Sequence, residues 1–243
     1  MSAGAIQTWV AQAAEGDRAA LAALNRHLAA LDAEQRVALA LAELPGVHAL
    51  SSSFGAQAAV SLHLLTRQRP ELPVILIDTG YLFAETLDFA DQLRQRLALN
   101  LHIFRAEQSP AQMEARHGQL WLQGRAGIEH YNRLRKVEPM QRALAELGVG
   151  TWFAGIRRQQ ADSRRQIEFL ERRDGRFKLH PLADWSNRDI WRYLQTHRLP
   201  YHPLWEQGYV SIGDRHSTSR WSAGMREQDT RFAGLVRECG LHA

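Results

Sequence analysis

Cysteine is almost absent from this 243-residue sequence, which contains a single one, Cys239. One cysteine cannot close an internal disulfide, so the chain is not a small secreted domain held together by disulfides. It also cannot supply the several thiolates that hold a four-cysteine zinc ion or an iron–sulfur cluster. Thiol chemistry in this chain must therefore rely on one side chain.

Long apolar runs are absent as well. The longest stretch without Asp, Glu, Lys or Arg, 44–66, contains serines, histidines and glycines that make it too polar to span a membrane. The first 18 residues lack the basic segment and apolar core of a secretory signal peptide. We therefore expect a cytoplasmic protein with no membrane partner.

A large excess of one charge sign is also lacking. The chain has 30 basic and 26 acidic residues, a net charge of +4. Residues 157–178 alone hold eight basic and four acidic residues, which is also +4, so the remainder is balanced. This distribution favours one local anion site over an extended nucleic-acid surface, although a solvated, charged hairpin has the same composition.

The pattern that is present alternates short apolar segments with helical periodicity. It predicts strands at 47–50, 73–78, 99–104 and 151–156, and helices at 57–66, 83–97 and 137–147. Asp174-Gly175 is typical of a hairpin turn. The alternation predicts an α/β fold with a largely parallel, twisted sheet flanked by helices.

We expect a single domain over 1–243 with three parts. Residues 1–44 form a helical N-terminal preface, in which Asp32 and Gln35 have the spacing of a capping box. Residues 45–205 form the α/β core. Residues 206–243, rich in glycine, serine and charge, form a mobile C-terminal arm.

Small and polar residues follow the first predicted strand. Ser51, Ser52, Ser53 and Gly55 lead into the next helix, where backbone N–H groups and hydroxyls are able to bind an anion. The loop is neither a Walker A motif nor a GxGxxG loop. An ordinary strand–helix turn with capping serines is the alternative.

Two further strand ends carry chemistry-bearing residues. Asp78-Thr79-Gly80 follows the second strand, where ligands of open α/β sheets bind, although the tripeptide is also a common turn. Gly155 comes just before an arginine cluster, and arginine binds phosphate or sulfate through two hydrogen bonds. The cluster consists of Arg157, Arg158, Arg164 and Arg165, for which a salt-bridged surface loop is the alternative.

The lone cysteine lies in a polar tail. Arg237 and His242 are close in sequence to Cys239, and positive neighbours increase the thiolate fraction of a cysteine. A buried, inert cysteine is the alternative. We expect Cys239 to be reactive.

Six segments in order resemble the thioredoxin-dependent phosphoadenylyl-sulfate (PAPS) reductases: SSSFGAQ, IDTGYLFAET, KVEPMQRAL, TWFAGIRRQQADSR, YHPLWEQGY and ECGLH. The resemblance runs from about Leu50 to His242. It implies an adenine-nucleotide α-hydrolase-like fold with a modified PP-loop. It also implies a cytoplasmic homodimer that acts in sulfate assimilation.

The same resemblance implies the site residues. Cys239 would be the nucleophile, and His242 would help to close over the substrate. The serine loop would hold the phosphosulfate end of the nucleotide, and the turn after the second strand would lie near adenosine. The implied substrate-binding residues are Ser51, Ser52, Ser53, Gly55, Gln57, Asp78, Thr79, Gly80, Lys136, Gly155, Arg157, Arg158 and Arg164, with Arg231 or Arg237 from the arm.

Related enzymes that reduce adenylyl sulfate (APS) carry a four-iron cluster on a Cys-Cys pair and a Cys-x-x-Cys motif. The matching positions here are Tyr131, Asn132, Asp214 and Ser217, none of which is a thiol. The resemblance therefore implies PAPS rather than APS as substrate, with no iron–sulfur cluster and no other bound cofactor.

The residues also favour a mechanism. Since Cys239 is the only redox group that the sequence contains, its thiolate would attack the sulfur of PAPS and carry an S-sulfonate. No second cysteine is present to release sulfite, so an external dithiol, thioredoxin or glutaredoxin, would be the co-substrate.

Two other function classes compete with this interpretation. An adenylyl transferase of the ATP pyrophosphatase type would share the PP-loop, but such enzymes usually carry Ser-Gly-Gly-x-Asp-Ser instead of SSSFGAQ. A basic nucleotide- or RNA-binding module without catalysis would need a basic stripe with interleaved aromatic residues, and no such stripe is apparent. Neither would lose all activity when Cys239 is alkylated.

Overall fold

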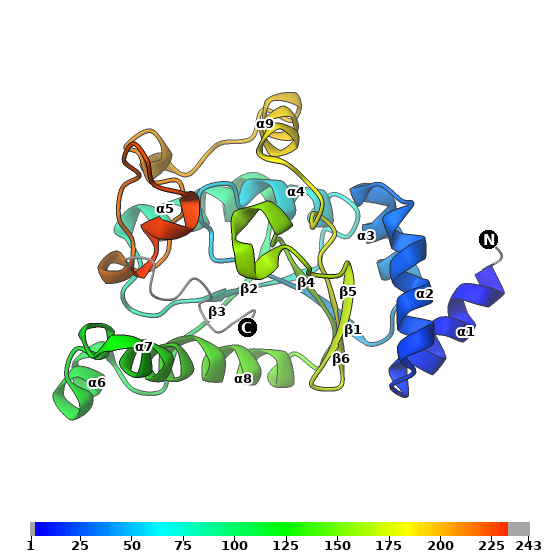
Figure 1. Ribbon diagram of the computed structural model, residues 1–243, viewed down its shortest axis with the longest axis horizontal. Helices are drawn as coiled ribbons and strands as arrows, with labels where there is room; N and C mark the ends of the chain where they lie inside the picture. The colour runs from blue at the N-terminus through cyan, green and yellow to red at the C-terminus, as the bar shows by residue number, and fades with distance from the viewer. Residues whose placement is uncertain (1–2, 233–243) are drawn as a thin grey trace.

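The computed structural model describes residues 3–232, which are arranged around a six-stranded sheet (Figure 1). The strand order is β3-β2-β1-β4-β6-β5. All neighbours pair in parallel except β5, which pairs antiparallel with β6 at one edge. The strands are β1 (Val47–Ser51), β2 (Pro73–Ile77), β3 (Asn100–Phe104), β4 (Val149–Ala154), β5 (Leu170–Arg173) and β6 (Arg176–Leu179).

Helices cover both faces of this sheet. In Figure 1, α4 and α5 lie on one face and α8 on the other, while α1–α3 stand beyond the β5 end. The helices are α1 (Ala3–Ala14), α2 (Arg18–Ala29), α3 (Ala33–Glu43), α4 (Ala59–Thr66), α5 (Ala84–Leu97), α6 (Pro110–His117), α7 (Gly124–Asn132), α8 (Glu138–Glu146) and α9 (Asn187–Thr196). A π-helical turn, Arg133–Val137, joins α7 to α8.

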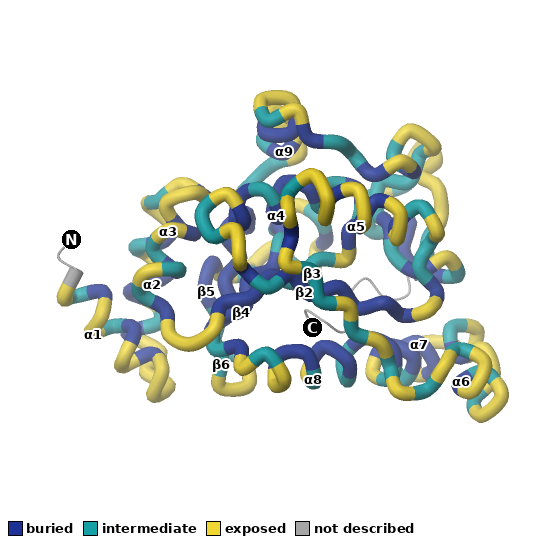
Figure 2. Tube along the Cα trace, turned by 180° about the vertical axis from the view of Figure 1, so that it is seen from behind, coloured by how far each residue is buried: buried dark blue, intermediate teal, exposed yellow. Residues whose placement is uncertain are grey.

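The strands are apolar because helices bury them on both sides. Val74, Ile75 and Leu76 of β2 are at most 1% exposed, as a central parallel strand requires. Figure 2 shows the inner strands as buried and the outward surface of α5 as exposed, while α4 is almost entirely buried. The predicted α/β class and its mostly parallel sheet are therefore confirmed.

The predicted segments match the elements with small shifts at their ends. The hairpin at Asp174-Gly175 is present, with φ of +48° and +76° at the two residues, which suits a tight two-residue turn. Its two strands are β5, which begins at Leu170, and β6, which ends at Leu179. Helices α6 and α7 were not predicted.

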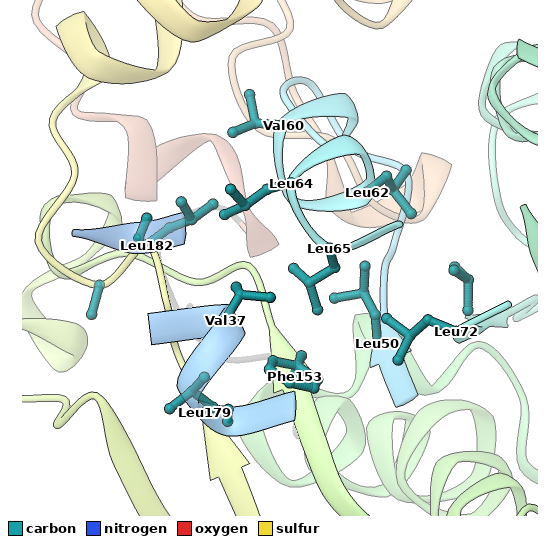
Figure 3. Close-up of a cluster of buried hydrophobic side chains, with 14 of the residues drawn as sticks. Val37, Leu50, Val60, Leu62, Leu64, Leu65, Leu72, Phe153, Leu179 and Leu182 are labelled. Carbon is teal, nitrogen blue, oxygen red and sulfur yellow. The ribbon is translucent and has the colours of Figure 1, made fainter. Parts of the chain in front are cut away.

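One hydrophobic core joins the preface to the sheet. Asp32 accepts from the backbone N–H of Gln35 at 2.8 Å, and the Gln35 side chain accepts from Asp32 at 3.0 Å, so the predicted capping box starts α3. In Figure 3, Val37 of α3 lies among side chains of β1, α4 and β4. This shared core fixes the carboxyl ends of the central strands, where the site lies.

The arm packs on the core as far as the structure describes it. An isolated bridge pairs Leu82 with Asp214, and a second pairs Thr218 with Arg231. Ile212 and Phe232 are buried. Residues 206–232 therefore cover the carboxyl ends of the strands. Within residues 3–232, no helix has the length and apolar character needed to cross a membrane.

Candidate functional site

A cavity of about 220 Å³ opens at the carboxyl ends of β1, β2 and β4. Its lining combines the serine loop after β1, the turn after β2, the arginine segment after β4 and part of the arm. Ligands of open α/β sheets bind at this edge, because the connections there diverge from neighbouring strands. The structure thus brings together the three strand ends that the sequence indicated.

The serine loop presents backbone donors to the cavity. The Ser51 hydroxyl accepts from the Trp152 indole N–H at 2.7 Å, and the Ser52 hydroxyl accepts from the Phe54 N–H at 3.1 Å. Phe54 is buried and has φ of +49°, a left-handed conformation that turns the loop sharply. Among the described residues, no protein acceptor faces the N–H groups of four neighbours: Ser53, Gly55, Ala56 and Gln57. Such a group of free N–H donors forms an anion-binding nest.

Arg157 fixes this loop to the opposite wall. Its guanidinium is 2% exposed and donates to the Gln57 side chain at 2.8 Å and to Asn187 at 2.9 Å. Burial lowers the pKa of Arg157, but an arginine remains charged at neutral pH. Arg164 donates to the Gln160 side chain at 2.7 Å, which places a second guanidinium at the cavity.

A buried ion pair forms the wall below the turn after β2. The Lys136 Nζ lies 2.7 Å from Asp214 Oδ2, with side-chain exposures of 6% and 1%. The Thr79 hydroxyl donates to Asp214 Oδ1 at 2.5 Å. Lys136 belongs to the π-helical turn, a distortion that often re-aims side chains at functional sites. Burial would raise the pKa of Asp214, but Lys136, Thr79 and Arg231 together hold it at about 2.

Arg231 is the tail arginine that the structure places in the cavity. Its Nη2 donates to the Ser217 hydroxyl at 3.2 Å. The guanidinium passes directly over Gly213, where an added Cβ would lie 2.0 Å from Arg231 Nη1. Only glycine leaves room for it at this position. Arg237, the alternative tail arginine, lies outside the described residues together with Cys239 and His242.

Three of the residues that were expected to bind substrate lie elsewhere. Asp78 accepts from the Gly80 N–H at 2.9 Å and from Arg105 at 2.8 Å, and neither Asp78 nor Gly80 lines the cavity. Arg158 donates to the Ile167 carbonyl and stacks 4.7 Å from the centre of the Phe169 ring, away from the cavity. The other expected residues within the described chain do line it: Ser51, Ser52, Ser53, Gly55, Gln57, Thr79, Lys136, Gly155, Arg157, Arg164 and Arg231.

Four positions were matched above to the cluster cysteines of related enzymes, and they are neighbours in space: Tyr131, Asn132, Asp214 and Ser217. The Ser217 N–H donates to the Asp214 carbonyl at 3.1 Å. Burial is the main cause that raises the pKa of Tyr131, and the negative charge of Asp214 raises it further. Asn132 is buried beside Tyr131. An ion pair and aromatic rings therefore fill this region within the described residues.

Sequence reasoning missed several residues of the cavity. Asp214 and Glu227 are carboxylates on the wall of a site that was expected to be basic, and Gln160 links two arginines. Asp214 lies in an arm segment without periodicity, so no pattern predicted its burial. The described lining carries four cations and two carboxylates, which leaves a net positive charge suited to an anion: Lys136, Arg157, Arg164, Arg231, Asp214 and Glu227.

Comparisons with known proteins agree with this geometry. The family model described as "Phosphoadenosine phosphosulfate reductase domain" matches residues 47–220. A phosphoadenosine 5′-phosphosulfate reductase of Xanthomonas campestris is 65% identical over 91% of this chain and 92% of its own. One from Pectobacterium atrosepticum is 59% identical, with 92% of each chain covered.

Solved structures give the same result. The phosphate complex of a PAPS reductase from Candida auris has a TM-score of 0.73 and 29% identity, covering 84% of this chain and 98% of that one. An FMN adenylyltransferase from Candida glabrata, 15% identical with a TM-score of 0.56 over 91% and 75% of the two chains, shares the fold alone. On these matches, the chain belongs to the phosphoadenosine phosphosulfate reductase family.

Proposed function

We propose that this chain reduces PAPS to sulfite and adenosine 3′,5′-bisphosphate, with thioredoxin or glutaredoxin as electron donor, in sulfate assimilation. Family membership supports the reaction, since the curated relatives carry its name. The observation that carries the proposal is the cavity itself. It sets a loop of free N–H donors opposite Arg157, Arg164, Lys136 and Arg231, which suits a phosphosulfate and its leaving phosphate.

The chemical steps follow from the single thiol. The Cys239 thiolate attacks the sulfur of PAPS, and the bond from that sulfur to the bridging oxygen breaks. The bisphosphate leaves with the bonding pair, and Cys239 carries the S-sulfonate. One thiolate of the dithiol donor then attacks the Cys239 sulfur, and sulfite leaves with two electrons. The second thiol of the donor resolves the mixed disulfide, so one dithiol is oxidised to a disulfide for each sulfite.

The residues of the cavity have separate tasks in this scheme. The N–H groups after β1 hold the sulfate or phosphate oxygens, and the cations neutralise charge that develops on the leaving phosphate. His242 and Arg237 come from the tail that carries Cys239 and would help to enclose the substrate. We further propose that the enzyme is a cytoplasmic homodimer that needs no iron–sulfur cluster, since one cysteine cannot ligate one.

Sulfite release tests the substrate. The enzyme should turn over PAPS with a higher kcat/KM than APS in the presence of reduced thioredoxin, and release no sulfite catalytically without a dithiol. Equal or faster turnover of APS would refute the substrate assignment. Iron in stoichiometric amount in the purified protein would refute the absence of a cluster.

The covalent step has its own test. Incubation with PAPS alone should release one equivalent of the bisphosphate per site and add the mass of one SO₃ group to the peptide that contains Cys239. Cys239→Ser should still bind the bisphosphate but gain no adduct, because a hydroxyl is a much weaker nucleophile than a thiolate. An adduct on another residue, or sulfite from the Ser variant at the wild-type rate, would contradict the mechanism. So would full activity after alkylation, which an adenylyl transferase of this fold would retain.

A further inference from the structure

A buried carboxylate lies in the wall of a cavity that otherwise attracts anions. Asp214 is 1% exposed and lines the same space as four cationic side chains. By Coulomb's law alone, its negative charge weakens the binding of a phosphate or sulfate. The contacts of Asp214 show what this carboxylate contributes to the site despite its negative charge.

Three segments meet at this carboxylate. Oδ1 accepts from the Thr79 hydroxyl at 2.5 Å, which ties the arm to the turn after β2. Oδ2 lies 2.7 Å from Lys136 Nζ, which ties the arm to the π-helical turn. The backbone of Asp214 continues into Ser217, whose hydroxyl accepts from Arg231 at 3.2 Å. The positions of two cations of the cavity, Lys136 and Arg231, therefore depend on Asp214.

We infer that Asp214 is a positioning residue, which keeps the Lys136 ammonium charged and directed at the cavity and anchors the arm segment that carries Arg231. The inference rests on the proposed function for the identity of the anion. It goes beyond that function, because it assigns a role to a residue that does not itself attract the substrate.

Burial explains why Lys136 needs this partner. An ammonium removed from water favours its neutral form unless a counter-charge compensates for the lost hydration. A lysine side chain also has four rotatable bonds, so without a fixed partner the Nζ atom samples many positions. A carboxylate at 2.7 Å offsets both costs, and the group of Lys136, Asp214 and Arg231 retains a charge of +1.

The titratable groups that face this pair keep a single charge state between pH 6 and 9. Burial raises the pKa of Tyr131 and of Tyr81, so both phenols stay neutral. Burial lowers the pKa of His216 to about 4, so its imidazole stays neutral as well. The remaining charged neighbours are the guanidiniums of Arg135, Arg215 and Arg231.

The lysine content allows a direct measurement without substrate. The chain has two lysines, Lys136 and Lys178, so protein labelled with ¹⁵N-lysine gives two ammonium signals that Lys178→Arg assigns. In the wild type, the Lys136 ammonium should exchange slowly with water at pH 7. In Asp214→Asn its signal should broaden or vanish while that of Lys178 remains. A Lys136 signal that is unchanged by Asp214→Asn would overturn the inference.

Binding of adenosine 3′,5′-bisphosphate is the second measurement, by calorimetry from pH 6 to 9. Asp214→Asn should bind roughly 10–150-fold more weakly at pH 7.5, and the loss should grow toward pH 9. Lys136→Met should bind as weakly at every pH, and the double variant no more weakly than Lys136→Met, since the two changes disrupt one interaction. Asp91→Asn removes a solvent-exposed partner of Arg94 and should match the wild type.

The opposite outcomes are equally clear. If Asp214 only subtracts charge, Asp214→Asn binds the bisphosphate as tightly as the wild type or more tightly, with an unchanged pH profile, and the inference is wrong. Additive losses in the double variant would also contradict it. If the wild type binds no bisphosphate, the proposed function fails, while the lysine spectra still decide the role of Asp214. If Asp214→Asn does not fold, the wild-type spectrum decides, because a Lys136 ammonium that exchanges as fast as a solvated lysine excludes the pair.

Discussion

Arg157 and Arg158 are adjacent in the sequence but belong to different surroundings. Arg157 is 2% exposed, lines the cavity and donates to Gln57. Arg158 turns toward the Phe169 ring and the Ile167 carbonyl. Arg157 has an extended backbone, whereas Arg158 begins the short helix Arg158–Gln160, so the two side chains leave the chain in different directions and only Arg157 faces the cavity.

The two arginines therefore give a matched pair of variants. Arg157→Ala should weaken binding of the bisphosphate roughly 10–150-fold, because it removes a charged donor and releases the serine loop. Arg158→Ala should change binding by no more than about twofold, the effect of a substitution away from the site. Calorimetry on folded protein measures both. Equal losses would place both guanidiniums on the ligand, as the sequence alone predicted.

Residue types and positions along the chain were sufficient to predict most of the cavity, but not the direction of each side chain. Ser51 to Gly55 and Arg157 were predicted because they follow apolar strands. Asp78 was also predicted, yet its carboxylate accepts from Gly80 and Arg105 and closes a turn. Asp214 was missed because its burial depends on Lys136 and Thr79, which are far away in the sequence.

At the scale of elements, the strands and the helices that cover them were predictable because burial requires continuous apolar runs. Helices α6 and α7 were not, since this part of the chain has short helices separated by Gly118 and Gly124. Rings from separate segments pack around them, with Tyr81 and Trp121 5.1 Å apart and Trp121 stacked 4.0 Å from His216. Such contacts between distant segments leave no periodic signal in the sequence.

His202 joins two elements through both ring nitrogens. Nδ1 accepts from the Leu204 N–H at 3.1 Å, so Nε2 carries the proton that is donated to the Thr86 hydroxyl at 3.0 Å. The short helix Pro203–Trp205 is thereby held against α5. A second proton would have to occupy Nδ1 and would break the bond to Leu204. Burial accordingly lowers the pKa of His202 to about 4, although Glu85 partly opposes this.

The fold should therefore lose stability in mild acid. The unfolded chain takes up a proton on His202 near pH 6.5 and the folded chain only near pH 4, so stability falls as the pH drops through this window. The contribution is up to about 3 kcal/mol. Denaturant unfolding at pH 7 and pH 4.5 measures the loss of unfolding free energy between the two pH values. In His202→Asn this loss should be smaller. Other histidines whose pKa burial lowers, among them His180 and His216 at about 4, contribute the remainder. If His202→Asn loses as much unfolding free energy as the wild type between pH 7 and pH 4.5, His202 does not contribute to the acid sensitivity.

At the scale of the whole molecule, the preface and the α/β core share one set of buried contacts. The core cluster runs from Ile6 in α1 to Leu199 after α9. Asn25 of α2 exchanges two hydrogen bonds with the backbone of Leu170, at 2.8 and 2.9 Å, and so covers part of the exposed edge of β5. An edge strand covered in this way is protected from pairing with another chain. We propose that the preface and the core unfold together as one domain.

Arg36 offers a test of whether the preface and the core unfold together. Its guanidinium is 2% exposed, lies 3.9 Å from the centre of the Phe169 ring, and pairs with both oxygens of Asp184 at 2.7 and 2.8 Å. It also donates to the Leu28 and Pro181 carbonyls. Arg36→Met leaves these acceptors unpaired and should lower the free energy of unfolding by about 2–4 kcal/mol.

In a chain of this size, that loss lowers Tm by roughly 5–15 °C. If the preface and the core are one cooperative unit, calorimetry of Arg36→Met should show a single transition at the lower temperature, because the core cannot keep its buried surface once α3 detaches. Arg94→Met, which removes an exposed pair with Asp91, should shift Tm by little more than about 1 °C. Two separate transitions in Arg36→Met, with the later one at the wild-type temperature, would instead show that the core unfolds independently of the preface.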